Sequence, residues 1–178
     1  ARGAFERGAV VTTFFDPGTH GATFSPCRLW RYSLWRRWSD CGTDHMVAFI
    51  GLNPSTADET KDDPTVRRCI RFAQDWGFGG MVMLNAFAYR ATDPNEMKRQ
   101  ADPVGPENDA CLIEASTLFA RMVACWGAHG VWRGRQDRLA ELLKGRELFH
   151  LGLTQGGSPR HPLYLPKSVK PQAWKVGA

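Results

Sequence analysis

The chain has 178 residues, of which 43% are hydrophobic, and a formal net charge of +5 with a pI near 9.1. This composition is ordinary for a folded globular protein and excludes a disordered chain. The length predicts a single domain over residues 1–178, with residues 1–45 as an N-terminal β extension packed on it. The mild excess of basic residues is compatible with a phosphate-rich partner. The basic residues beyond Glu147, where no acid follows, are Arg160, Lys167, Lys170 and Lys175.

The five cysteines form no CxxC pair and no Cys/His cluster with zinc-finger spacing. The first residues, ARGAFERG, lack an apolar signal core, and no apolar stretch of about 18 residues occurs. We therefore expect a soluble, cytoplasmic protein of a reducing compartment, with no metal and no membrane partner.

The segment CRLWRYSLWRRW, residues 27–38, alternates arginines with aromatic residues. This alternation predicts antiparallel strands, packed on an edge of the main sheet or beside a pocket. In one interpretation they form an amphipathic hairpin with the arginines in water. In the other, the arginines and aromatic rings form a surface that binds phosphates and stacks on bases.

From residue 46 onwards, apolar runs of strand length alternate with helical patterns. The first helix is expected to begin at Asp63 and Pro64, a capping residue followed by a proline that suits the first turn, and to end at Gly77. The other expected helices begin at Pro106 and Arg135. The expected strands are residues 46–51, 81–84, 122–126 and 147–153. This pattern predicts an α/β fold, with a three-layer α/β/α arrangement around a central, mainly parallel four-stranded sheet.

Polar residues follow each expected strand at its carboxyl end. In open α/β sheets, ligands bind outside these ends. A single asparagine after a strand is usually a turn residue, but four strands that end in polar groups together favour a binding site. The residues concerned are Asn53 to Ser55, Asn85, Gly127 to His129, and Thr154 to His161.

The residue types narrow the ligand to a nucleobase. An asparagine side chain offers a donor and an acceptor at fixed spacing, which matches the edge of an amide-containing ring such as uracil or thymine. A neutral histidine can donate to a carbonyl that gains negative charge. The chain has no P-loop sequence, no GxGxxG after a strand and no GxSxG elbow, so we expect no dinucleotide cofactor.

Four segments, GLNPS, LNAFAYRATDP, CWGAHG and GGSPRHPLYL, occur in the order found in the uracil-DNA glycosylase superfamily, which the chain resembles. It resembles more closely a bacterial and phage group, the DUF1643 family, through DDPTVRRC, RATDP, VGPEND, CWGAHG and SPRHPLYL. The resemblance covers roughly residues 24 to 166. It implies a uracil-DNA glycosylase-like fold and a base that is flipped out of the duplex into a pocket.

The resemblance also implies roles for individual residues. Asn53 falls on the position that orients or activates the attacking water, and Asn85 falls where an asparagine pairs with the flipped pyrimidine. His161 falls on the histidine that donates to the leaving base. Ser55 takes the place of a tyrosine that excludes a 5-methyl group in uracil-specific enzymes, so we expect the pocket to accept a 5-substituted pyrimidine.

The remaining expected contacts are with the base and the DNA backbone. Leu52 and Phe87 are expected beside the base, and Leu163 or Tyr164 is a candidate for insertion into the duplex. The other expected DNA contacts are Arg90, Ser158, Arg160 and Lys167. Arg90 has a second interpretation, a local pair with Asp93 that shapes its loop.

Asn53 cannot act as a base as an aspartate can, so a carboxylate is sought elsewhere. Asp58, Asp62 and Asp63 are the candidates, with helix capping as the alternative for the last two. Similar alternatives apply to His129, which either caps a turn or touches the ligand. Asn108 and Asp109 are expected to have capping or dipole roles in the first turn of a helix.

These observations favour a monofunctional DNA glycosylase that hydrolyses the N-glycosidic bond of a damaged, mismatched or modified pyrimidine. One alternative is a non-catalytic reader of modified bases, and another is an enzyme that acts on free nucleosides or nucleotides. We expect a monomer that needs no cofactor or metal and whose partner is DNA containing a modified or damaged base.

Overall fold

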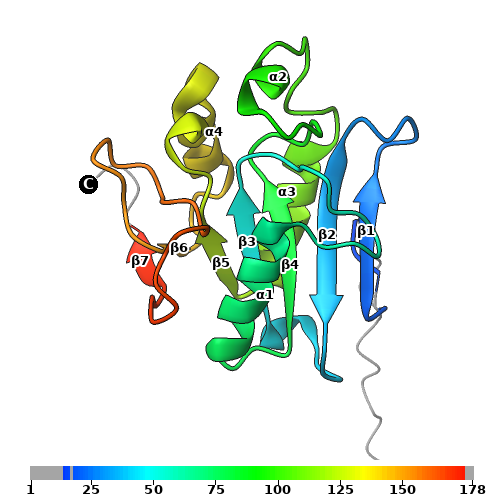
Figure 1. Ribbon diagram of the computed structural model, residues 1–178, viewed down its shortest axis with the longest axis vertical. Helices are drawn as coiled ribbons and strands as arrows, with labels where there is room; N and C mark the ends of the chain where they lie inside the picture. The colour runs from blue at the N-terminus through cyan, green and yellow to red at the C-terminus, as the bar shows by residue number, and fades with distance from the viewer. Residues whose placement is uncertain (1–13, 17, 175–178) are drawn as a thin grey trace, which may run out of the picture.

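The computed structural model describes residues 14–16 and 18–174; Lys175 and residues 1–13 of the expected N-terminal extension lie outside them. The described chain forms one seven-stranded mixed sheet with the strand order β1-β2-β4-β3-β5-β6-β7 (Figure 1). The strands are β1 (His20–Phe24), β2 (Arg31–Arg37), β3 (Met46–Gly51), β4 (Gly80–Asn85), β5 (Arg121–Ala124), β6 (Leu148–His150) and β7 (Gln172–Trp174).

The four strands expected from the apolar runs are present, and β4, β3, β5 and β6 run parallel to one another in that order. The prediction of a four-stranded sheet is nevertheless wrong. On one side β2 pairs antiparallel with β4, with Leu34 opposite Met83, and β1 pairs with β2. On the other side β7 pairs antiparallel with β6. The N-terminal strands are thus part of the same sheet, since β2 offers side chains that are buried on both faces.

Helices follow the expected starts, with small shifts. The first turn of α1 is capped by Asp63, whose Oδ1 accepts a hydrogen bond from the Val66 N–H over 2.8 Å. Gly77, with φ of 86°, follows the helix end as expected. One helix, α2, was not expected; Asp93 caps it by accepting from the Asn95 N–H over 2.9 Å. The helices are α1 (Pro64–Asp75), α2 (Pro94–Lys98), α3 (Asn108–Leu118) and α4 (Arg135–Leu142), with 3-10 turns η1 (Thr43–His45) and η2 (Ala128–Gly134).

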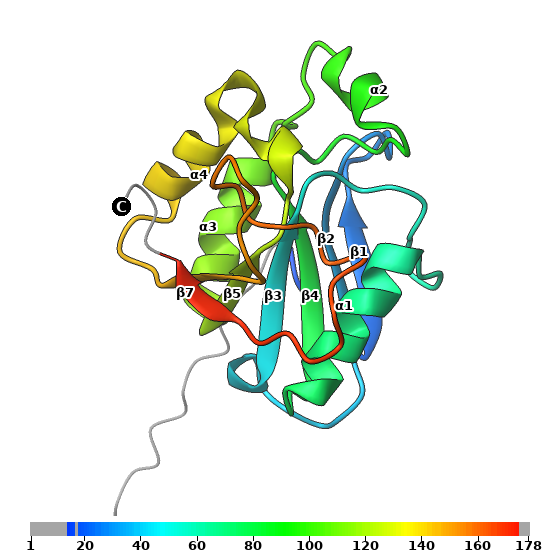
Figure 2. The ribbon, with the colours of Figure 1, turned by 60° about the vertical axis from the view of Figure 1, so that its left-hand side comes forward.

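Alternate side chains of β3 enter two separate apolar clusters. Val47 and Phe49 pack with Phe72 of α1, whereas Ile50 belongs to the cluster that contains Leu112 of α3. Figure 2 shows α1 and α3 on opposite sides of β3 and β4. Helices therefore pack against both faces of the sheet, while the full three-layer arrangement stays a prediction. In the part of the chain that the structure describes, every helix is too short or too polar to span a membrane.

Candidate functional site

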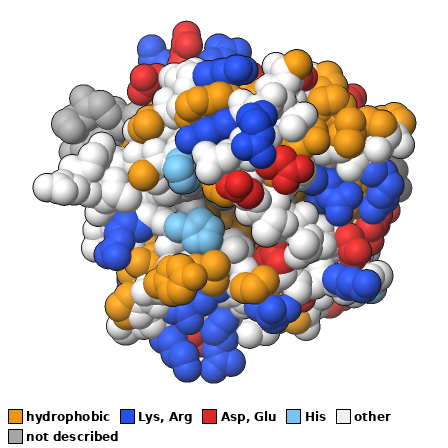
Figure 3. Space-filling view, turned by 45° about the horizontal axis from the view of Figure 1, so that its top comes forward, with side chains coloured by type: hydrophobic (Ala, Val, Ile, Leu, Met, Phe, Trp, Pro, Cys, Tyr) orange, Lys and Arg blue, Asp and Glu red, His pale blue; other side chains and the backbone are white. Residues whose placement is uncertain are grey.

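A cavity of about 640 Å³ lies at the carboxyl ends of β3 and β4, where the polar residues were expected. Figure 3 looks onto this end of the molecule and shows a hollow bordered by histidine and acidic side chains. The cavity is also lined by the start of α1, by η2 after β5, and by the segment after β6. Chain segments that are far apart in the sequence thus meet here, as the parallel strands require.

Asn85 is a polar cavity residue whose side chain is almost completely buried. It is the last residue of β4 and is only 2% exposed. Its side-chain Nδ2 has no hydrogen-bond partner among the described residues. A buried amide N–H without a partner costs about 1–3 kcal/mol. Such a group in a ligand-sized cavity is ready to donate to a bound molecule.

Two buried residues hold the backbone behind Asn85 in place. Asn108 donates from Nδ2 to the carbonyl oxygens of Asn85 and Ala86, over 3.0 and 3.2 Å. Arg135 donates from Nε to the Ala86 carbonyl over 2.6 Å and forms an ion pair with Asp109 at 2.7 Å. Of the capping or dipole roles expected for Asn108, capping is therefore wrong, since its buried Oδ1 accepts no hydrogen bond from the described residues. It fixes the strand end instead.

The Asn53 side chain is oriented by three backbone carbonyl groups. Its Nδ2 donates to the oxygen of Ala91 over 2.7 Å, to that of Pro54 over 3.0 Å and to that of Tyr89 over 3.5 Å. Because the amide nitrogen is used in this way, Oδ1 is the atom left to interact with a ligand or water in the cavity that Asn53 lines. Asn53 thus presents an acceptor and not a donor.

His161 lines the same cavity and is half-buried. Its Nδ1 accepts a hydrogen bond from the Leu163 N–H over 3.3 Å, so in the neutral ring the proton is on Nε2. Burial lowers the pKa of His161 below its usual 6.5, although the charge of Asp63 opposes this shift. The residue is therefore a neutral donor near pH 7. The Gly127 N–H donates to the Pro159 carbonyl over 2.8 Å, which ties this segment to the end of β5.

His129 is a second histidine that lines the cavity. The Lys98 Nζ lies 3.0 Å from its Nδ1, and only the ammonium can donate between these two atoms when the histidine is neutral. His129 therefore also presents its Nε2 proton. Its position supports contact with a ligand over the alternative of a turn cap.

Arg31 and Asp63 belong to the cavity and were not expected there together. Arg31, on β2, is 1% exposed and donates from Nη1 to the Ala57 carbonyl over 2.8 Å. Burial lowers the pKa of Arg31 to about 10. Asp63 is buried and lines the cavity while it caps α1. The capping alternative for Asp63 is thus confirmed, without removing the carboxylate from the site.

The arginines of residues 27–38 do not form one exposed face. Arg31 and Arg36 are buried, and Arg36 pairs with Asp62 at 2.8 Å. Arg28 is exposed and pairs with Glu59 at 2.7 Å. The interpretation of a hairpin with its arginines in water is therefore wrong, because β2 is an interior strand of the sheet.

Two residues predicted to act in catalysis or to contact the base, Asp58 and Phe87, do not line the cavity. The Asp58 carboxylate accepts from the Thr60 and Lys61 N–H groups over 2.9 and 2.8 Å, which closes a local turn and lowers the pKa of Asp58. Phe87 is buried in the core with its ring centroid 5.6 Å from that of Trp132.

The remaining predicted residues lie in or around the cavity mouth. Leu52, Ser55 and Leu163 line the cavity, and Ser55 also lines an adjoining open groove with Arg90. Tyr164, directly after Leu163, is 97% exposed and has φ of 70°.

The other predicted DNA contacts lie outside the cavity lining. Ser158 is buried, and its N–H donates to Thr154 Oγ1 over 3.1 Å. Arg160 and Lys167 are exposed. Arg90 donates to the Arg28 carbonyl over 3.2 Å, so the expected pair with Asp93 is replaced by this bond and by the helix cap.

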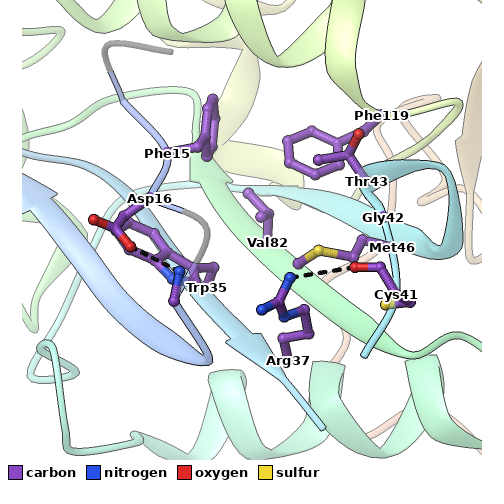
Figure 4. Close-up of a pocket in the computed structure, with 11 residues that line it drawn as sticks. Phe15, Asp16, Trp35, Arg37, Cys41, Gly42, Thr43, Met46, Val82 and Phe119 are labelled. Atoms are coloured by element: carbon purple, nitrogen blue, oxygen red, sulfur yellow. Dashed lines mark hydrogen bonds between the residues drawn. The ribbon is translucent and has the colours of Figure 1, made fainter. Parts of the chain in front are cut away.

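A second cavity, of about 230 Å³, lies at the amino end of β3. Figure 4 shows the aromatic side chains of Phe15, Trp35 and Phe119 around it, and Arg37 donating to the Cys41 carbonyl over 3.3 Å. Its lining is mainly apolar, and it holds none of the polar groups that follow the parallel strands. The larger cavity is therefore the candidate site. Residues 14–16 and 18–174 contain no group of three or more His, Cys, Asp or Glu side chains that could hold a metal.

The fold and the site define a mixed α/β protein with a cavity at the carboxyl ends of its parallel strands, lined in part by histidine, asparagine and aspartate side chains. Over residues 31–163 the chain matches the model of the family "Protein of unknown function (DUF1643)", and it belongs to that family. No curated protein and no solved structure matches the chain. The matched segment begins at Arg31 and ends at Leu163, both of which line the cavity.

Proposed function

We propose that this protein is a DNA glycosylase that flips a damaged, mismatched or modified pyrimidine into the larger cavity and hydrolyses its N-glycosidic bond. The observation that carries the proposal is that the unpaired, buried amide of Asn85 and the neutral His161 line one cavity. A flipped base needs both a group that reads its edge and a donor for the charge it gains on leaving. The resemblance to the uracil-DNA glycosylase superfamily and its three-layer fold belong to the same proposal.

In this reaction the oxygen of a water molecule forms a bond to C1′ of the sugar, and the electron pair of the broken C–N bond stays with the base. The proton that the water loses passes through solvent to the departed base, which ends as the neutral free base. Asn85 donates to an acceptor on the base edge, and His161 donates from Nε2 to the carbonyl oxygen that gains negative charge. Asn53 orients the water through Oδ1. Of the three aspartates considered from the sequence, Asp63 lines the cavity, and we assign it to face the positive charge that develops on the sugar.

The residues at the cavity mouth suit a duplex partner. Tyr164 is exposed and directly follows Leu163, which lines the cavity, and we assign its ring to fill the space left by a flipped base. Arg90 and Ser55 line the adjoining groove, where a backbone phosphate can lie. The small side chain of Ser55 leaves room for a 5-substituent on the pyrimidine. The proposal includes a cytoplasmic monomer that needs no cofactor.

The test is release of a base from labelled duplex and single-stranded oligonucleotides. The panel carries uracil, thymine mismatches, 5-hydroxymethyl and larger 5-substituted pyrimidines, and deaminated purines, and alkali cleaves any abasic site formed. We expect strand breaks for at least one pyrimidine, lost in Asn85→Ala and His161→Ala proteins and kept in His45→Ala, which changes an exposed histidine outside the cavity. Breaks that persist in both cavity variants would contradict the assignment.

A second candidate function is a reader that binds a modified base without cleaving it. It is favoured by one observation: the Asn53 amide cannot accept a proton, and Asp58 is engaged in a turn outside the cavity. A reader would bind one modified oligonucleotide tightly in the same panel and produce no strand breaks.

A further inference from the structure

Arg31 differs from the other buried arginines in the described part of the chain. Arg36 pairs with Asp62 at 2.8 Å, and Arg135 pairs with Asp109 at 2.7 Å. Arg31 is the most deeply buried of the three, yet it takes part in none of the ion pairs formed by the described residues.

An unpaired charge in this position is costly. Among the described residues, Nη1 of Arg31 has one hydrogen-bond partner, the Ala57 carbonyl, and the buried Nε has none. Burial lowers the pKa of Arg31; the charges of Asp63 and Asp58 favour its charged form, while those of Arg90 and Arg36 oppose it. A buried charge is normally paired or fully hydrogen-bonded. A buried Arg31 charge without an ion pair is therefore not explained by a contribution to stability.

The position of Arg31 supplies that reason. Arg31 and Asn85 line the same cavity, and each has a buried side-chain nitrogen with no partner among the described residues. Unpaired donors on two side chains require a ligand that brings acceptor oxygens. A guanidinium group matches the geometry of a carboxylate or a phosphate, to which it can donate two parallel hydrogen bonds.

We propose that Arg31 is a specificity-determining residue that binds an anionic oxygen group of the ligand in the larger cavity. The proposal rests on the proposed function where that group is a carboxylate carried by the flipped base. If the ligand is a free nucleotide, the same chemistry is that of its phosphate. In both cases the ligand supplies the anionic group that forms an ion pair with Arg31.

The test measures binding and not cleavage. Duplex oligonucleotides carry a single pyrimidine with a 5-methyl or a 5-carboxyl group on a 2′-fluorinated sugar, which slows cleavage of the glycosidic bond. Fluorescence anisotropy gives the two dissociation constants at constant salt, because phosphate contacts depend steeply on ionic strength. A second arm measures free deoxyuridine, its 5-carboxyl derivative and deoxyuridine monophosphate by calorimetry.

The wild-type protein is expected to bind the carboxylated base, or in the second arm an anionic ligand, at least tenfold more tightly than its neutral counterpart. Arg31→Met is expected to abolish this preference, and Arg31→Lys to retain part of it because the charge remains. Arg71→Met, which changes an exposed arginine of α1 outside both the larger cavity and the adjoining groove, is expected to keep it. Equal affinity of the wild type for anionic and neutral ligands in both arms, or no binding in either, overturns the proposal.

A purely structural role predicts a different result. If Arg31 serves only to hold the Ala57 carbonyl, Arg31→Met lowers the melting temperature and the wild type shows no anion preference. We expect instead that the melting temperature of Arg31→Met is unchanged or raised, because an uncompensated buried charge is removed. The wild-type comparison needs no variant, so it decides the question even if a variant fails to fold.

The outcomes for Arg31 and for the glycosylase proposal are separable. Strand breaks in the oligonucleotide panel without anion preference would leave a glycosylase in which Arg31 has no such role. Anion preference that depends on Arg31, with no strand breaks for any base, would support the role of Arg31 and favour the reader or the enzyme on free nucleotides.

Discussion

The backbone N–H of Leu163 donates to Nδ1 of His161 over 3.3 Å, and this bond decides which ring nitrogen carries the proton. With Nδ1 occupied as an acceptor, the neutral ring must present Nε2–H. The same short segment that follows β6 therefore sets both the position of the histidine and its tautomer. In the proposed reaction, this tautomer provides the donor to the leaving base.

The first prediction concerns this donor. His161→Ala should lower the rate of base release by about 100- to 1000-fold, the usual cost of removing one donor to a developing oxyanion. His161→Gln, which can still donate from its amide, should recover part of the loss. Single-turnover kinetics separate this effect on chemistry from an effect on binding. Equal rates for the alanine and glutamine variants would show that donation is not the role of this side chain.

The second prediction concerns pH. Burial lowers the pKa of His161 in the folded protein from 6.5, so the unfolded state binds more protons as the pH falls. The stability that His161 contributes is therefore present above about pH 6.5 and is lost as the pH falls through its folded value. The melting temperature of the wild type should decline more between about pH 7.5 and 5 than that of His161→Gln. His150, whose pKa burial also lowers, is present in both proteins and cancels in the comparison.

The third prediction contrasts two buried asparagines. Asn108→Leu should lower the free energy of unfolding by about 1–3 kcal/mol, because it leaves the Asn85 and Ala86 carbonyl groups without their donor. Asn85→Leu should leave stability unchanged or raised, since it removes an amide nitrogen that has no partner in the described structure. Ligand binding should be lost in Asn85→Leu. Denaturant unfolding and binding assays on both variants check this, and a large loss of stability in Asn85→Leu would contradict it.

The fourth prediction is that Asn53→Asp, which introduces a carboxylate at the position assigned to the attacking water, destabilises the protein. The Asn53 Nδ2 donates to three carbonyl oxygens, and a carboxylate in its place would oppose them with negative charge. We expect a loss of about 1–3 kcal/mol of stability near pH 7. The loss should be smaller near pH 4, where a protonated carboxyl group can still donate. Thermal unfolding at the two pH values measures the difference, with Asn53→Ala as the variant that lacks the pH dependence.

The fifth prediction concerns Tyr164, which has φ of 70° and is almost fully exposed. A residue with a side chain is strained in this conformation by about 1–2 kcal/mol, whereas glycine is not. Tyr164→Gly should therefore be more stable than Tyr164→Ala. If the ring enters the duplex, the wild type should distort the DNA, and the fluorescence of 2-aminopurine placed beside the target base should rise on binding. Both variants should lack this rise. An unchanged fluorescence signal would remove Tyr164 from the DNA interface.

Much of the site was predictable because parallel strands bring their carboxyl ends together. Asn53, Asn85 and His161 follow different strands, and that rule alone places them in one cavity. Arg31 and Asn108 were not found in this way. Their roles depend on which strand lies beside β4 and which carbonyl groups its end exposes, and neither fact has a local signal in the sequence.

The fold was predictable where burial leaves a pattern and not elsewhere. The apolar runs of β3 and β4 are unmistakable because both faces of these strands are covered. In contrast, β7 has no apolar run and is defined only by its pairing with β6. The arginines of β2 gave no local sign of an interior strand, because the acceptors of their hydrogen bonds, such as Asp62 for Arg36 and the Ala57 carbonyl for Arg31, lie far away in the sequence.

The outer strands of the sheet have a consequence for association between molecules. Parallel strands with open edges offer unpaired N–H and C=O groups to any other chain that can align with them. Here β2 covers β4 and β7 covers β6, so the described sheet ends in the short strands β1 and β7 on either side. Short antiparallel strands make poor templates for further pairing. The additions at the two ends of the chain thus insulate the site-bearing strands from edge-to-edge aggregation.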